Sequence, residues 1–233
     1  MTSNLLKPFG PNIWTVDGPT VTVIGFHYPT RMAIIRLADG ALFIWSPVAH
    51  TEDLGRELSA IGIVRFIIAP NTLHDLFLSQ WQRVYPEAKL HVPSDLSQRH
   101  NGLTVHADLQ DAAPNEWAGQ VEQVIVCGNR IATEVVFFHV ASRTVLFTDL
   151  IQNFPSGWFT GWRAIIATLD GLTSSEPTVP QKFRVAFSDR KAARASLARI
   201  CSWPADKVLM AHGTPVLRDG SGFIRRAFAW LMK

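Results

Sequence analysis

The sequence predicts an α/β sandwich in which sheets lie inside and helices lie outside. Two groups of strand-like segments, each followed by helical segments, favour this layered order. A doubly wound parallel sheet fits less well, because the first four strands arrive without the crossover helices that parallel neighbours need. The length of 233 residues suits one large domain, and we expect residues 1–233 to form it.

The first half of the chain contains strands wherever β-branched and aromatic residues cluster between turn signals. Asp39-Gly40 marks a hairpin turn. Thr51 can cap a helix in which Leu54 and Leu58 have helical spacing. These features predict strands at 12–17, 21–26, 32–37, 42–45, 64–69 and 89–92, and helices at 51–61 and 74–85.

The second half follows a polar and irregular segment at 93–118. The aromatic loop 153–162 has two interpretations: its rings line a pocket, or they fill a satellite core, which we favour slightly. The last helix is basic and amphipathic, and we expect it to pack on its own domain rather than on a membrane. The patterns predict strands at 121–126, 134–140, 144–147 and 207–210, and helices at 188–201, capped by Ser188, and at 223–232.

Composition excludes several classes of protein. Hydrophobic residues make up 47% of the chain and charged residues 18%, which is typical of a globular domain. The net charge of +3 is scattered, so we expect no nucleic-acid partner. No apolar run is long enough for a membrane span or a signal peptide, which predicts a cytoplasmic protein. Cys127 and Cys201 are the only cysteines, so any metal needs His, Asp or Glu ligands.

Polar side chains of metal-ligand type follow three of the predicted strands. His74 and Asp75 come shortly after the strand at 64–69, Asp149 follows the strand at 144–147, and His212 follows the strand at 207–210. Apolar strands that run into isolated His or Asp are expected when side chains converge at one edge of a sheet. Imidazole and carboxylate together suit Zn²⁺, Fe²⁺ or Mn²⁺. We therefore predict a metal site made of His74, Asp75, Asp149 and His212.

Each of these residues also has a structural interpretation. The His74 ring could bond to backbone, Asp75 could stabilise a helix N-terminus, and Asp149 could cap a turn. The combination with His212 favours ligation for His74 and Asp149 and leaves Asp75 evenly balanced. His139 lies inside a strand and is expected to be structural. Glu134 is either a substitute ligand or a partner of Asn129 or Arg143.

The order of these motifs resembles the metallo-β-lactamase fold superfamily, and within it a bacterial and plant family catalogued as a domain of unknown function. The matching stretches are LADGALFIWSPV, APNTLHDLFLSQW, EVVFFHVASRTVLFTDLIQN and VLMAHGTPV. The resemblance covers nearly the whole chain. It implies a four-layer αββα sandwich with a metal centre.

The superfamily's usual hydrolases carry a His-x-His-x-Asp-His motif, a His in a Gly-His turn, a bridging Asp and a final His before Gly. The resemblance places Asp149 at the bridging aspartate and His212 at the final histidine. His74-Asp75 falls at the Asp-His end of the first motif in reversed order, and Asn71 lies near its first histidine. Asn129 stands where the Gly-His histidine is expected. These departures imply a reduced site that holds a single Zn²⁺ or Fe²⁺ ion.

Two functional hypotheses follow from the resemblance. In the first, the protein is a metal-dependent hydrolase of an ester or phosphoester small molecule, with Asp149 and His74 as catalytic residues. In the second, the chain is a catalytically inactive binding or scaffold module without a metal. A di-iron redox role fits less well, because nothing in the sequence resembles a flavin-binding domain. The sequence leaves the substrate and the oligomeric state open, and the first hypothesis is preferred.

Overall fold

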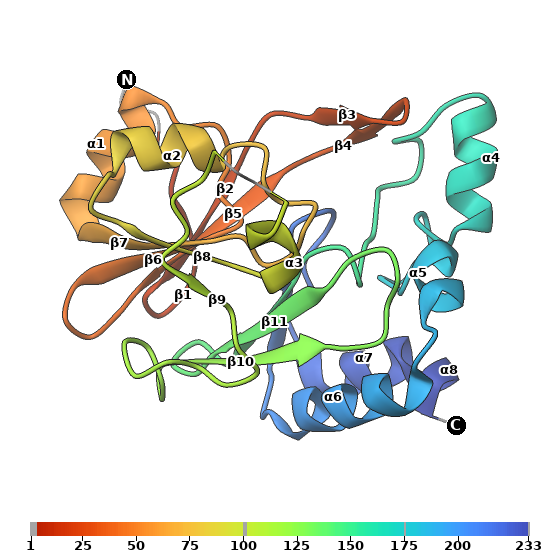
Figure 1. Cartoon of the computed structure of the whole chain (residues 1–233). Coiled ribbons are helices and arrows are strands. Elements are labelled where there is room, and N and C mark those ends of the chain that lie inside the picture. The colour runs from red at the N-terminus through yellow and green to blue at the C-terminus, as the bar shows by residue number, and fades with distance from the viewer. Residues whose placement is uncertain (1–3, 100–101, 175, 233) are drawn as a thin grey trace.

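A computed structural model of the chain describes residues 4–99, 102–174 and 176–232 and shows four layers in the order helix, sheet, sheet, helix (Figure 1). This is the predicted αββα sandwich. The first sheet has seven strands in the described part of the chain. In spatial order they are β1 (Lys7–Gly10), β2 (Ile13–Asp17), β5 (Arg31–Arg36), β6 (Ala41–Trp45), β7 (Ile63–Ile68), β8 (Lys89–Val92) and β9 (Ala107–Asp108).

The two faces of the first sheet are both apolar because both are covered. Ile34, Ile44 and Ile67 face the helices α1 (Glu52–Ile61) and α2 (Leu78–Val84). Their neighbours Ile35 and Phe43 point to the opposite side, into the core between the sheets. Side chains alternate between faces with a period of two, so continuous apolar runs mark strands buried on both sides.

The second sheet contains β10 (Val121–Val126), β11 (Glu134–His139), β12 (Thr144–Phe147) and β13 (Lys207–Met210), in that order. Its outer face packs on α6 (Arg190–Ser202), α7 (Gly220–Ala227) and α8 (Ala229–Met232). These helices lie on the opposite side of the molecule from α1 and α2 (Figure 1). The expectation that the last helical segment packs on its own domain is confirmed, and the described residues contain no helix long and apolar enough to cross a membrane.

A separate two-stranded hairpin projects beyond the sheets. It consists of β3 (Val21–Val23) and β4 (Phe26–Tyr28), and it reaches toward α4 (Trp162–Leu169) (Figure 1). Phe26 packs edge-on against Phe159 and Trp162, with ring centroids 5.5 and 5.6 Å apart. Phe159 is buried in a small cluster of its own, so the satellite-core interpretation of the aromatic loop is confirmed for that residue.

Several element boundaries differ from those predicted. The strand expected at 21–26 is a hairpin, because Ile24 and Gly25 both have positive φ (48° and 77°) and turn the chain within two residues. The helix expected at 74–85 begins at Leu78, because the Asn71 side chain accepts a hydrogen bond from the Leu73 amide (2.9 Å) and holds a loop before it. Elements that were not expected are β1, α3 (Ser94–Ser97), β9, α4 and α5 (Gln181–Ala186).

The cap of α6 is also one residue later than predicted. Asp189, not Ser188, occupies the N-cap position, and its side chain accepts a hydrogen bond from the Ala192 amide at 2.9 Å. Both residue types are good caps. The choice between them depends on where the backbone leaves the preceding loop, and the Ser188 amide is already bonded to the Gly128 carbonyl (2.9 Å).

Two histidines outside the candidate site are buried in the sheets. His139, at the end of β11, is 2% exposed and hydrogen-bonds to the Ser142 hydroxyl (2.8 Å), which confirms its structural role. His91, in β8, is 4% exposed and packs against Trp117. Burial lowers the pKa of each to about 4, so both are neutral at pH 7.

The cap assignment predicts that Asp189→Ala destabilises the protein and that Ser188→Ala does not. Loss of the cap should lower the free energy of unfolding by about 1 kcal/mol, and we expect Ser188→Ala to change it by less than about 0.5 kcal/mol. Urea unfolding of both variants measures the difference. Equal losses would show that Asp189 does not cap the helix.

The buried histidines predict that stability falls as the pH drops from about 6.5 to about 4. In this window the unfolded chain protonates His91 and His139, while the folded chain keeps them neutral. The unfolded state then binds more protons, so the free energy of unfolding decreases, by at most roughly 3 kcal/mol for each histidine. Urea unfolding across the window measures this loss, and a constant stability would contradict it.

Candidate metal centre

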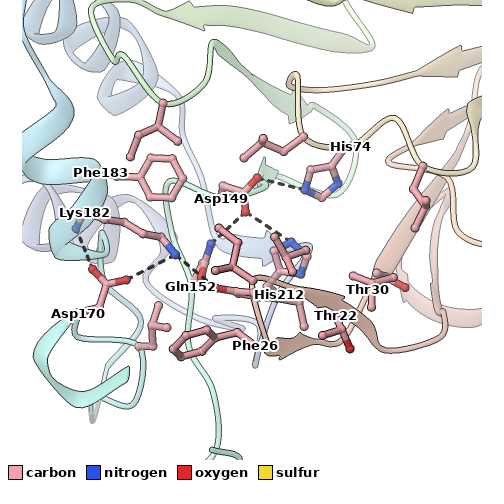
Figure 2. Close-up of a pocket in the computed structure, with 18 of the residues that line it drawn as sticks. Thr22, Phe26, Thr30, His74, Asp149, Gln152, Asp170, Lys182, Phe183 and His212 are labelled. Atoms are coloured by element: carbon pink, nitrogen blue, oxygen red, sulfur yellow. Dashed lines mark hydrogen bonds and ion pairs between the residues drawn. The ribbon is translucent and has the colours of Figure 1, made fainter. Parts of the chain in front are cut away.

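Three of the four predicted ligands meet at one point between the sheets. His74, Asp149 and His212 each offer an atom, and these atoms lie within 4.8 Å of one another. His74 Nε2 is 3.3 Å from Asp149 Oδ2, and His212 Nε2 is 3.5 Å from Asp149 Oδ1. Asp149 and His212 are each 6% exposed. Figure 2 shows the carboxylate between the two imidazoles.

The pairing of β12 with β13 explains how Asp149 and His212 meet. The two strands are parallel neighbours in which Phe147 is paired with Met210. Asp149 and His212 each follow the paired residue at the same distance, so both side chains emerge at the same edge of the second sheet. The convergence predicted for carboxyl ends of neighbouring strands therefore applies to these two residues.

His74 comes from the first sheet, through the loop that follows β7. The loop is tied to the second sheet by a hydrogen bond from the Val135 amide to the Pro70 carbonyl (2.7 Å) and by a β-bridge between Asn71 and Glu134. The His74 ring then lies over the site, with its centroid 5.2 Å from that of His212. The three side chains thus come from both sheets and from positions far apart in the sequence.

Glu134 holds the turn that carries Asp149. Its Oε1 accepts a hydrogen bond from the Thr148 amide (2.8 Å), and its Oε2 accepts from the amides of Asp149 (2.9 Å) and Leu150 (3.0 Å). Burial and the charge of Asp149 raise the pKa of Glu134, while these amides oppose the shift. Glu134 is therefore neither in the group of three ligands nor a partner of Asn129 or Arg143, as the sequence had suggested; Asn129 donates to the Phe183 carbonyl instead (3.0 Å).

The two histidines are oriented so that Nε2 faces Asp149. His212 Nδ1 donates to the Pro29 carbonyl (2.7 Å), because a carbonyl oxygen can only accept. His74 Nδ1 is hydrogen-bonded to the Ser46 hydroxyl (2.8 Å). Such a bond to the second ring nitrogen is the usual way in which proteins orient a ligating imidazole.

The turn after His212 leaves no room for a side chain. Gly213 has a φ of 112°, and a Cβ atom placed there would lie 1.7 Å from the Asn153 carbonyl oxygen. Arg31 donates to the carbonyls of Met210 (3.0 Å) and Gly213 (2.6 Å) on both sides of the histidine. Glycine is required at this position, which explains the His-Gly pair noted in the sequence.

The charges of the group favour a cation. Burial lowers the pKa of His212 to about 4 despite the opposing effect of Asp149, so Nε2 carries a lone pair at pH 7. Burial alone would raise the pKa of Asp149, but His74, His212 and Asn71 hold it well below its usual range, so the carboxylate is ionised. Two acceptor atoms, His212 Nε2 and Asp149 Oδ1, therefore face each other across 3.5 Å.

The donor set fits a divalent metal ion. With one ligand atom from each residue, the three atoms lie within 4.8 Å of one another, compared with roughly 3.3 Å between two ligands of a tetrahedral zinc ion. Two imidazoles with one carboxylate form the protein part of many catalytic zinc sites and of non-haem Fe(II) sites. His74, Asp149 and His212 are the residues that would hold the ion.

Asp75 is not brought into this group. It lies in the loop before α2 and lines the cavity next to the group, but it is not among the residues whose ligand atoms lie within 4.8 Å of one another. The other interpretation of Asp75 was a carboxylate that stabilises a helix N-terminus. It assumed a helix that begins at His74, whereas α2 begins at Leu78.

Two amide side chains complete the surroundings of Asp149. Asn71 Nδ2 donates to Asp149 Oδ2 (2.6 Å), and Gln152 Nε2 donates to Asp149 Oδ1 (3.0 Å). In the sequence, Asn71 stands out only by its place in the motif, and Gln152 does not stand out. The signal for Gln152 was its position three residues after the predicted ligand, inside the matched stretch FTDLIQN.

The group forms part of the wall of a cavity of about 860 Å³. The β3–β4 hairpin, the loop before α2, and the α4 and α5 regions supply other walls. Figure 2 shows Phe26, Phe183 and Lys182 around the opening that leads to Asp149. This size is typical of small-molecule sites.

Comparison with solved structures defines the class of fold. The chain is similar to the DIM-1 metallo-β-lactamase, with 12% identity, a TM-score of 0.64 and coverage of 97% of this chain and 96% of that one. A metallo-β-lactamase from Pontibacter korlensis gives 12% identity, a TM-score of 0.63 and 98% coverage of both chains. The Flv1 flavodiiron core from Synechocystis sp. PCC6803 gives 12% identity and a TM-score of 0.64, covering 97% of this chain and 60% of that one. The chain has the metallo-β-lactamase fold.

The sequence itself identifies a narrower group. Residues 11–160 match the model of a domain of unknown function, DUF4336, and the chain belongs to this family. A search of curated proteins finds no significant match. The match to the family model establishes the family. The similarity to the solved structures, at 12% identity, establishes only the fold.

The contacts of Glu134 predict that Glu134→Gln destabilises the protein. Both carboxylate oxygens accept backbone hydrogen bonds, so the new NH₂ group must face at least one amide N–H. Leaving a buried donor without an acceptor should lower the free energy of unfolding by about 1–3 kcal/mol. Urea unfolding measures this loss against Glu87→Gln, an exposed control expected to change stability by less than about 0.5 kcal/mol. Equal effects would show that Glu134 does not hold the turn.

Proposed function

We propose that this protein is a metal-dependent hydrolase with a single-ion site formed by His74, Asp149 and His212. The convergence of these three side chains in the wall of a small-molecule cavity is the observation that carries the proposal. Zinc and ferrous iron both suit the donor set. The substrate belongs to the ester or phosphoester class.

A divalent ion at this place would supply a Lewis acid and lower the pKa of water in the site. The chain supplies the remaining parts. Asp149, ionised at pH 7 and held by Asn71 and Gln152, can accept a hydrogen bond from the attacking water and orient it. His74 and His212 present Nε2 and keep it toward the site through their Nδ1 bonds.

The reduced ligand set explains why we propose one ion. Asn71 lies where the resemblance expects the first histidine, and its amide donates to Asp149. Asn129 stands where the resemblance expects the Gly-His histidine and is bonded to the Phe183 carbonyl. Neither residue offers a ligand for a second ion, so the second Lewis acid of a two-metal site is missing and turnover should be slow.

One observation favours the alternative, a binding module without a metal. Both oxygens of Asp149 already accept hydrogen bonds from amides, Oδ2 from Asn71 and Oδ1 from Gln152. A buried carboxylate that is satisfied in this way persists without a cation. We rank this alternative second, because the amide donors do not place a donor or a cation between the two acceptor atoms His212 Nε2 and Asp149 Oδ1.

Metal analysis decides between the two. Untagged protein purified without chelator should contain close to one equivalent of zinc or iron per chain, and it should hydrolyse a chromogenic ester or phosphoester. His74→Gln and His212→Gln should lose both properties together, because each removes one of three ligands. His27→Gln, which changes an exposed histidine on β4, should keep both.

The contradicting result is equally clear. A wild-type chain that holds well under one equivalent of metal, even after incubation with zinc and with ferrous iron, would exclude the hydrolase. Retention of metal by His212→Gln would exclude this site as its location.

A further inference from the structure

We propose that the substrate of this site is an uncharged ester whose acyl part is a straight aliphatic chain, which lies along the cavity with its carbonyl group at Asp149. The cleavage of that ester depends on the hydrolase proposed above. The binding of the chain depends only on the cavity.

The cavity has a polar wall at the candidate ligands and a largely apolar remainder. The polar wall is formed by the three candidate ligands with Gln152 and Ser46. Aliphatic side chains dominate the remainder, among them Val23, Ile24, Leu73, Leu76, Ile166 and Leu169. A site of this kind suits a ligand with a polar head and an apolar tail.

Several of these wall residues are exposed to solvent. Ile24 is 91% exposed, Leu169 is 73% exposed and Leu76 is 65% exposed. They come from three separate elements, the β3–β4 turn, α4 and the loop before α2, yet all border one cavity. Exposed aliphatic groups that gather around a pocket indicate a surface that an apolar ligand covers.

The conformation of Ile24 supports the same conclusion. Its φ of 48° lies in the left-handed region, where a β-branched residue is an outlier and where hairpin turns normally have Asn, Asp or Gly. Core packing does not explain it, because the side chain is almost fully exposed. Strain of this kind gathers at ligand sites, and here it places an isoleucine at the opening of the cavity.

The charges of the cavity favour an uncharged ligand. Among the described residues that line it, Asp75, Asp149 and Asp170 are acidic, and Lys182 supplies the one amine. The Lys182 amine lies 3.5 Å from an oxygen of Asp170, which compensates its charge (Figure 2). In the metal-free protein, a phosphoester or a carboxylate would thus enter a region with an excess of negative charge and no uncompensated lysine or arginine among those residues.

The polar wall also has a place for a hydrogen-bond donor of the ligand. The Gln152 side chain lines the cavity, is 1% exposed, and its Oε1 has no partner among the described residues. A hydroxyl or amide N–H near the ester would satisfy it. This contact would place the head of the ligand next to Asp149, to which the other end of the same amide group donates.

The reaction is then ordinary ester hydrolysis. The oxygen of water forms a bond to the acyl carbon, the bond from that carbon to the alkoxy oxygen breaks, and the alkoxy oxygen takes up the proton that the water loses. The products are an alcohol and a carboxylic acid. The acid ionises at pH 7.

Binding of unhydrolysable ketones tests the proposal. Straight-chain 2-alkanones of increasing length displace the neutral dye N-phenyl-1-naphthylamine from metal-stripped protein. We expect the affinity to rise about fourfold for each added methylene, until the chain fills the cavity. Fatty acids and alkyl phosphates of the same length should bind at least about tenfold more weakly.

Matched variants locate the binding. Leu76→Glu and Leu169→Glu place a charge in two different walls of the cavity and should weaken ketone binding at least about tenfold. Leu217→Glu is the control, because Leu217 is similarly exposed (61%) but does not line the cavity, and it should bind within about twofold of wild type. All three positions are exposed, so the folded state tolerates the change.

The outcomes separate this proposal from that of the hydrolase. Affinity that does not depend on chain length, stronger binding of the anionic ligands, or equal binding by Leu169→Glu and Leu217→Glu would overturn the acyl-chain proposal. Chain-length-dependent binding, combined with a wild-type chain that takes up neither zinc nor ferrous iron, would support the acyl-chain site and refute the hydrolase alone.

Discussion

The contacts of one buried carboxylate hold the centre of this molecule together. Glu134 accepts hydrogen bonds from three consecutive backbone amides, those of Thr148, Asp149 and Leu150. They fix the direction in which the chain leaves β12 and hence the position of the Asp149 side chain. The same residue forms a β-bridge with Asn71, in the loop that brings His74 from the other sheet. The whole candidate site thus depends on a residue that touches no ligand atom of the group.

This dependence explains why the site tolerates a buried negative charge. A carboxylate without partners would be neutral or would destabilise the fold. Asp149 is ionised because His74, His212 and Asn71 surround it, and Glu134 is satisfied by the backbone. Arrangement of the peptide groups, rather than surface ion pairs, therefore accounts for the two carboxylates at the junction of the sheets.

Local strain is also concentrated around this junction. Ser46 is buried with a φ of 52° and places its hydroxyl on His74 Nδ1. Gly213 has a φ of 112° directly after His212. Such a conformation costs of order 1–3 kcal/mol at a non-glycine residue such as Ser46 and little at Gly213, which has no Cβ atom. Their position beside two candidate ligands indicates that the geometry of the group is maintained at a cost in stability.

The sequence predicted the layers and much of the site for identifiable reasons. Apolar runs such as those of β6 and β7 can only be strands covered on both faces, and Asp149 and His212 follow strands whose ends are obvious. The Glu134 contacts could not be predicted, because they join a side chain to amides that any residue supplies. Ser188 was misjudged as the cap of α6 because a single residue of offset separates two good capping residues. Asp75 lies outside the group of three, and the helix expected to begin at His74 begins only at Leu78.

A cation at this junction would also stabilise the folded state. His74 belongs to the loop after β7 of the first sheet, whereas Asp149 and His212 follow β12 and β13 of the second sheet. An ion held by all three would connect the two halves of the sandwich, and any ligand that binds only the folded state stabilises it by mass action. Without an ion, Asn71 makes the corresponding connection. Its side-chain amide belongs to the loop after β7 and donates to Thr148 and Asp149, which follow β12. Asn71 thus acts on the same carboxylate that would hold an ion, so the connection between the two sheets does not depend on a metal alone.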